Sequence, residues 1–108
     1  MPGRVVMRYP IFLFDGEDLI VFNTPKAHWD FLESYDLGAD RVFDSEGRQL
    51  TEADAGNDRV RIQDSGAEPN PERLRGMLLR ALRRRGKEFD DEASLGTLVA
   101  AAQRECGL

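Results

Sequence analysis

Cys106 and His28 are the one nucleophile and base that the chain can offer as a pair. Brought together in space, such side chains support nucleophilic catalysis, because the imidazole can deprotonate the thiol. His28, however, falls on the apolar side of one helical pattern, and Cys106 continues the apolar side of another. We therefore expect both in the core, and we predict no catalytic residue and no cofactor. One histidine and one cysteine also exclude an ordinary zinc site.

Acidic side chains gather around two expected turns. The first turn carries Asp15, Glu17 and Asp18, and Asp40, Asp44 and Glu46 surround the second. Carboxylate clusters can hold a hard cation or carry out acid–base chemistry, but Asp-Gly-Glu-Asp lacks the spacing of a calcium loop. Aspartate and glycine are also the residues that turns require. Plain turns are the interpretation we favour, and a partner-facing acidic surface and a metal or catalytic site are the two alternatives.

Six arginines occupy one predicted helix, and three of them follow its solvent-facing side at spacings of seven and four: Arg73, Arg80 and Arg84. A basic amphipathic helix can bind phosphate, anionic lipid or an acidic partner. No aromatic platform for stacking bases accompanies the arginines, so we expect no nucleic acid. We predict instead that these three arginines are held mainly by carboxylates, either of the same chain or across an interface.

The composition is that of a globular protein. The chain has 108 residues, 41% hydrophobic and 32% charged, which fits a single domain over 1–108 with 1–6 as a frayed leader. No apolar run is long enough for a transmembrane helix or a signal peptide, so we expect no membrane partner. A lone cysteine fits a reducing compartment, and we predict a cytoplasmic protein.

The net charge is −5 and is unevenly distributed. Residues 1–70 carry seven basic and fourteen acidic side chains, a net charge of −7, whereas residues 71–108 carry a net charge of +2. An acidic field repels nucleic acid unless a local patch overrides it. The charge distribution therefore also predicts that nucleic acid is not a partner.

Hydrophobic periodicity and turn residues predict an α+β fold in the order ββαβββαα, a largely antiparallel five-stranded sheet with helices packed on it. The first two strands are apolar at consecutive positions, which favours either burial on both faces or one exposed face used for binding. The predicted strands are 11–14, 19–22, 41–43, 48–52 and 59–63, and the predicted helices are 24–37, 71–86 and one from Asp90 or Asp91 to Cys106.

Three segments resemble a group of small bacterial proteins. Some members of this group accompany polymorphic secreted toxins as presumed immunity proteins, and others are uncharacterised. The three segments are a short strand pair from Pro10 to Gly16 onward, a helix ending in Glu33-Ser34-Tyr35-Asp36, and a strand followed by Asp44-Ser45-Glu46-Gly47-Arg48. The resemblance covers about the first half of the chain and contains no catalytic signature. It implies a cytoplasmic, non-enzymatic binder.

We therefore expect a protein-binding module of the immunity type, which occludes the active site of a toxin enzyme. An acidic surface would meet the basic cleft of a nuclease toxin by steered association. The expected partner-binding residues are Asp15, Glu17 and Asp18, with Trp29 and Glu33 as neighbours. The alternative is a structural or regulatory interaction domain with no toxin link, including a homodimer through the apolar hairpin.

Overall fold

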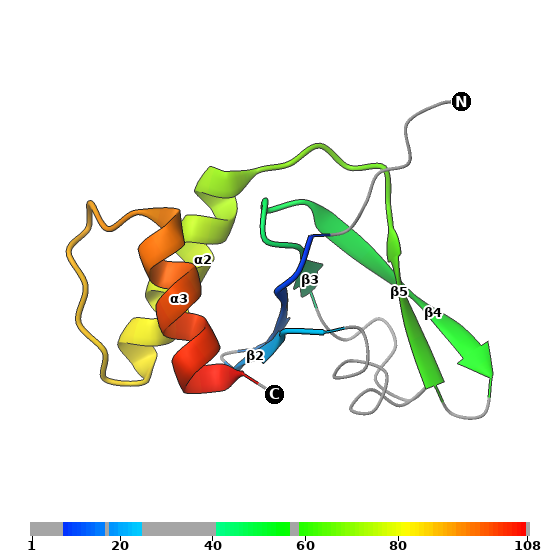
Figure 1. The fold of residues 1–108 in the computed structure, drawn as a ribbon, viewed down its shortest axis with the longest axis horizontal. Coiled ribbons are helices and arrows are strands. Elements are labelled where there is room, and N and C mark those ends of the chain that lie inside the picture. The colour runs from blue at the N-terminus through cyan, green and yellow to red at the C-terminus, as the bar shows by residue number, and fades with distance from the viewer. Residues whose placement is uncertain (1–7, 17, 25–40, 57–58, 108) are drawn as a thin grey trace.

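In the part of the chain that the structure describes, five antiparallel strands form one sheet, and two helices pack side by side on one of its faces (Figure 1). The computed structural model describes residues 8–16, 18–24, 41–56 and 59–107. The α+β class is confirmed. The helix predicted at 24–37, with His28, lies outside the described residues.

The sheet combines a hairpin with a three-stranded meander. Its strand order is β2-β1-β3-β4-β5, so β1 lies between its hairpin partner and β3. The β1–β2 register places Asp15 directly opposite Asp18 at the tip, and the β1–β3 register places Phe14 beside Arg41. The strands are β1 (Ile11–Asp15), β2 (Asp18–Phe22), β3 (Arg41–Phe43), β4 (Gln49–Gly56) and β5 (Arg59–Asp64).

Strand β4 is longer than the sequence suggests. We expected the strand to end at Glu52 and a turn to span Asp54–Asp58, but β4 continues to Gly56. Aspartate and glycine are poor strand formers, which is why their pattern indicates a turn. Pairing with β5 overrides this preference, with a register irregularity between Asp54 and Gly56.

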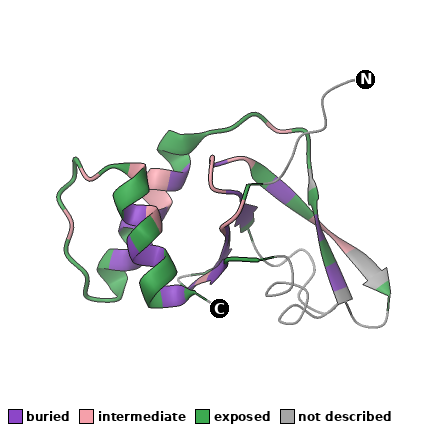
Figure 2. Ribbon diagram, in the orientation of Figure 1, coloured by how far each residue is buried: buried purple, intermediate pink, exposed green. Residues whose placement is uncertain are grey.

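Both faces of β1 are buried, which explains its consecutive apolar residues. Phe12 and Phe14 pack in the cluster that includes both helices, whereas Ile11 and Leu13 pack in a second cluster on the opposite face, with Val42, Leu50, Val60 and Ile62. Buried residues continue along the strands and along the helix sides that face them (Figure 2). The hairpin thus belongs to the core, and its buried side chains offer no exposed apolar face for a dimer.

The helices begin at side-chain caps. Helix α2 (Pro71–Arg84) starts after Asn70, whose side chain accepts a 3.1 Å hydrogen bond from the N–H of Arg73. Its buried stripe is Leu74, Leu78, Leu79, Ala81 and Leu82. Among the described residues, no helix is long and apolar enough to cross a membrane.

Helix α3 (Leu95–Cys106) starts later than the sequence suggests. We expected Asp90 or Asp91 at its start, but Ser94 caps it by accepting from the N–H of Thr97 at 3.2 Å. Asp90 instead closes a separate turn, in which its carboxylate accepts from the N–H of Glu92 at 2.8 Å. Aspartate and serine are both suitable cap residues, so only the tertiary structure decides which of Asp90, Asp91 and Ser94 begins the helix.

The turn between β3 and β4 holds the start of α2 against the sheet. The fully buried carboxylate of Asp44 accepts 3.0 Å hydrogen bonds from the N–H groups of Glu46 and Arg48. Gly47 has a φ of +80°, and a Cβ there would collide with the carbonyl of Asn70. This close approach fixes where α2 begins, and therefore which of its residues reach the end of β1.

Candidate functional site

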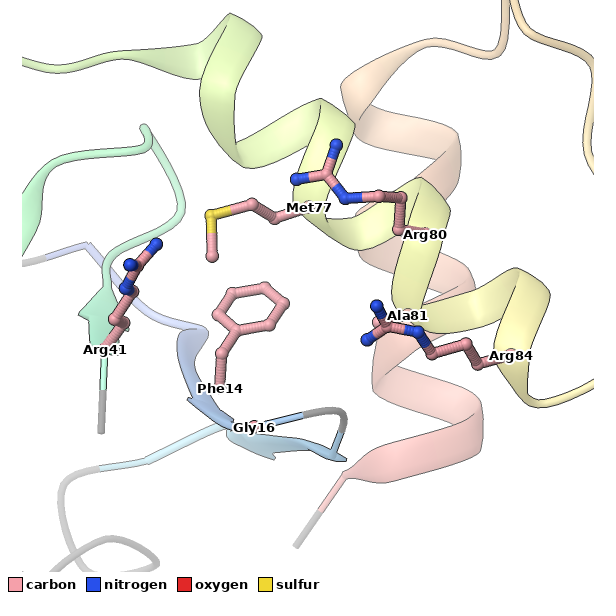
Figure 3. Close-up of a pocket in the computed structure, with 7 residues that line it drawn as sticks. All are labelled: Phe14, Gly16, Arg41, Met77, Arg80, Ala81 and Arg84. Carbon is pink, nitrogen blue, oxygen red and sulfur yellow. The ribbon is translucent and has the colours of Figure 1, made fainter. Parts of the chain in front are cut away.

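A pocket of about 320 Å³ opens between the end of β1 and the middle of α2. We call it the arginine pocket. Apolar side chains and three guanidinium groups line it, and both the strands and α2 contribute lining residues (Figure 3). The residues that line it are Phe14, Gly16, Arg41, Met77, Arg80, Ala81 and Arg84.

The three arginines come from two elements that the fold brings together. Arg80 and Arg84 are one turn apart on α2, and Arg41 begins β3 next to Phe14. Figure 3 shows the Phe14 ring between Arg41 on one side and Arg84 on the other, with Met77 above the ring. All three arginines are exposed, so their charges reach solvent at the pocket's rim.

No carboxylate among the described residues forms an ion pair with Arg41, Arg80 or Arg84. The ion pairs of the described chain engage other arginines and Lys87. The predicted pairing of Arg73, Arg80 and Arg84 is therefore not found there. Arg73 instead lies over the ring of Phe43, with its guanidinium carbon 5.3 Å from the ring centre.

Three carboxylates of the described chain are paired with Arg48 or Arg83 and not with the pocket arginines. Arg48 approaches Asp44 at 3.6 Å and Glu46 at 3.4 Å within their own turn. Arg83 pairs with Asp91 at 2.5 Å, and its hydrogen bond and charge hold the pKa of that carboxyl below its usual value. These pairs fix loops, and within the described residues none of them neutralises Arg41, Arg80 or Arg84.

The inner surface of the pocket between the arginines is apolar, and we call it the apolar floor. Phe14 is 8% exposed and packs edge-to-face on Phe43, with ring centres 6.0 Å apart. Ala81 is buried beside it, and Met77 is half-buried. Gly16 has open space where a Cβ would stand, which keeps the side next to the β1–β2 tip unobstructed.

The tip of the β1–β2 hairpin borders this pocket. Asp15 and Asp18, which we call the acidic tip, are exposed and face each other across it, and Gly16 between them lines the pocket. These are two of the five predicted partner-binding residues. The other three, Glu17, Trp29 and Glu33, lie outside the described residues.

Cys106 is poorly suited to nucleophilic chemistry. It is 9% exposed and packs in the core between the helices and the sheet. Burial raises the pKa of its thiol, with the Arg85 charge acting in the opposite direction, so the reactive thiolate is disfavoured. Within the described ranges, no three His, Cys, Asp or Glu side chains are grouped as metal ligands would be.

A second pocket, of about 400 Å³, lies at the connection between α2 and α3. It is lined by Arg83, Gly86, Lys87, Glu88 and Phe89. Its arginine is already paired with Asp91 and donates to the carbonyl of Phe89 at 3.0 Å. These contacts hold the connection in place, so the arginine pocket is the stronger candidate for binding.

Two of the three pocket arginines can be predicted from the sequence, but the pocket itself cannot. The spacing of Arg80 and Arg84 predicts their shared helix face. Their proximity to Arg41 and Phe14 depends on the pairing of β1 with β3, which no local pattern indicates.

Scans against protein-family models, curated proteins and solved structures each found no significant match to this chain.

Proposed function

We propose that this protein is a non-enzymatic protein-binding module whose binding face consists of the acidic tip and the arginine pocket. One observation carries the proposal: two groups of like charge adjoin at Gly16, and no ion pair neutralises either of them within the described chain. Such a face fits a partner that presents cationic and anionic groups in the complementary arrangement.

The arrangement of these charges works against stability. Asp15 lies directly opposite Asp18, and like charges in that relation destabilise a strand pair. Arg80 and Arg84 are four residues apart on α2, where like charges also destabilise. A partner of opposite charge would remove both repulsions on binding, which is why we assign these residues to recognition.

The immunity-type mechanism applies this face to a toxin enzyme in the cytoplasm. The acidic tip would enter a basic cleft, such as that of a nuclease, and exclude its substrate. The arginine pocket would receive an acidic side chain from the cleft's rim. Complementary charge speeds such an encounter, and the rate falls as salt screens the charges.

Co-expression with the product of the adjacent gene, followed by calorimetry of the purified pair, tests this proposal. We expect binding to weaken at least tenfold in Asp15→Asn/Asp18→Asn and, separately, in Arg80→Gln/Arg84→Gln. Wild-type binding should also weaken as salt is raised. No complex, or an affinity independent of salt and of both double substitutions, would contradict the proposal.

The matched control removes two positive charges elsewhere on the surface. Arg61 on β5 and Arg104 on α3 are exposed and do not line the arginine pocket. Arg61→Gln/Arg104→Gln alters the net charge by the same amount as Arg80→Gln/Arg84→Gln. If the control weakens binding equally, long-range charge and not this face governs recognition.

A homodimer is the second candidate, and the adjacency of the two charged groups favours it. A two-fold axis passing between them would place the acidic tip of each copy against the arginine pocket of the other. Light scattering over a range of concentrations tests this arrangement. A salt-sensitive dimer that Arg80→Gln/Arg84→Gln dissociates would support it, and a strict monomer at high concentration would eliminate it.

A further inference from the structure

We infer that the arginine pocket binds a phosphate monoester carried on a small apolar or aromatic body. The inference goes beyond protein binding and does not depend on it, since the pocket can be tested with small anions in the absence of any partner.

The positive charge of the pocket favours an oxyanion with more than one negative charge. Arg41, Arg80 and Arg84 contribute three positive charges, which no carboxylate of the described chain pairs with. A phosphate monoester carries a charge of about −1.5 to −2 at neutral pH, whereas a carboxylate carries only one negative charge. Guanidinium groups also bind phosphate through two parallel hydrogen bonds, which adds geometric selectivity.

The apolar floor of the pocket favours a ligand in which an apolar group is attached to that phosphate. Phe14, Met77 and Ala81 lie between the arginines, so an inorganic ion held at the rim would leave this surface uncovered. A ring or short alkyl group would cover it and gain apolar contact. The volume of about 320 Å³ is near the lower limit for ligand sites, roughly 300 Å³, which suits a small body such as one ring.

The acidic tip disfavours a polyanion. Asp15 and Asp18 do not line the pocket but belong to the same hairpin tip as Gly16, so the neighbouring phosphates of a nucleic acid strand passing that tip would approach their negative charge. A single phosphate avoids this repulsion, because the only charge that it carries lies among the arginines. The site is therefore suited to a monoester and not to a chain of phosphates.

Titration of the full chain with three probes, followed by amide chemical shifts, tests the inference. Phenyl phosphate carries both features, inorganic phosphate carries only the charge, and phenol carries only the ring. We expect saturable shifts of Gly16, Met77 and Arg84 with phenyl phosphate, at least tenfold weaker binding of inorganic phosphate, and no saturation with phenol. Equal affinities for phenyl phosphate and inorganic phosphate would overturn the role of the apolar floor.

Benzoate is the fourth probe, and it separates a phosphate site from a carboxylate site. We expect benzoate to bind at least tenfold more weakly than phenyl phosphate, since it carries a single charge. Benzoate that binds as tightly as phenyl phosphate would overturn the assignment to phosphate esters.

Substitutions then locate the binding. Arg80→Gln/Arg84→Gln should weaken phenyl phosphate binding at least tenfold, whereas the charge-matched Arg61→Gln/Arg104→Gln should leave it within about twofold. All four side chains are exposed, so both variants should fold, and their unfolding curves check this. Equal weakening in both variants, or none in either, would overturn the site. A failed titration would leave the partner-binding experiment unaffected, because that experiment uses no small anion.

Discussion

The backbone N–H of Asn70 donates a 3.1 Å hydrogen bond to the carbonyl of Gly47. This bond joins the β3–β4 turn to the residue that caps α2, and α2 carries Arg80 and Arg84. The turn is itself fixed by the buried carboxylate of Asp44. The position of the arginine pocket therefore depends on a contact far from the pocket itself.

Gly47→Ala should destabilise the protein strongly. The positive φ alone costs an alanine roughly 1–2 kcal/mol, and the collision with the Asn70 carbonyl adds to this cost. Gly66→Ala is the matched control, because Gly66 has a φ of +78° but open space around it. Urea unfolding should show a clearly larger loss for Gly47→Ala, and equal losses would mean that the turn can move away from α2.

Asp44→Ala should lower the free energy of unfolding by roughly 3–5 kcal/mol, the cost of breaking a buried ion pair from one side. It would leave the N–H groups of Glu46 and Arg48 without their acceptor and Arg48 without its buried carboxylate partner. Asp44→Asn keeps an oxygen acceptor and should lose less. Urea unfolding of the two variants measures the difference, and a larger loss for Asn than for Ala would contradict this explanation.

Leu78→Ala should cost about 2–5 kcal/mol, because Leu78 is fully buried in the core beneath α2. Arg80→Gln, on the exposed side of the same helix, should instead raise the free energy of unfolding by about 0.2–0.5 kcal/mol. The gain arises because the substitution removes the repulsion from Arg84. Thermal and urea unfolding test both, and a clear loss for Arg80→Gln would mean that the arginine has a stabilising partner.

Cys106 should react slowly with iodoacetamide at pH 8, since its thiol is buried and its pKa is raised. The folded state then retains this proton at a pH where the unfolded chain releases it. The resulting stabilisation is complete below the usual thiol pKa of about 9 and is lost as the pH rises above that value. Alkylation of the native protein as fast as that of the urea-unfolded chain would contradict this account.

Much of the local structure follows from the sequence because its causes are local. The Asn70-Pro71 start of α2 and its leucine stripe are set by capping and by helical periodicity. The hairpin follows from two β-rich runs joined by Asp15-Gly16. These elements are confirmed, and so is the α+β class that they imply.

The parts that could not be predicted depend on contacts between distant segments. Arg41 reaches the pocket only because β3 pairs with β1 across an intervening stretch of chain. The late start of α3 likewise depends on Arg75, which donates to the carbonyl of Ala93 at 2.7 Å and helps hold the preceding turn. Capping preferences are similar for Asp90 and Ser94, so the sequence alone does not choose between them.

The most direct test of the proposed binding face is the affinity of one identified partner for the two face variants and their control. The partner is the adjacent gene product, or a protein that co-purifies with the wild-type chain and is then identified. We predict at least tenfold weaker binding for Asp15→Asn/Asp18→Asn and for Arg80→Gln/Arg84→Gln, with Arg61→Gln/Arg104→Gln close to wild type. Wild-type affinity in both face variants would contradict the account.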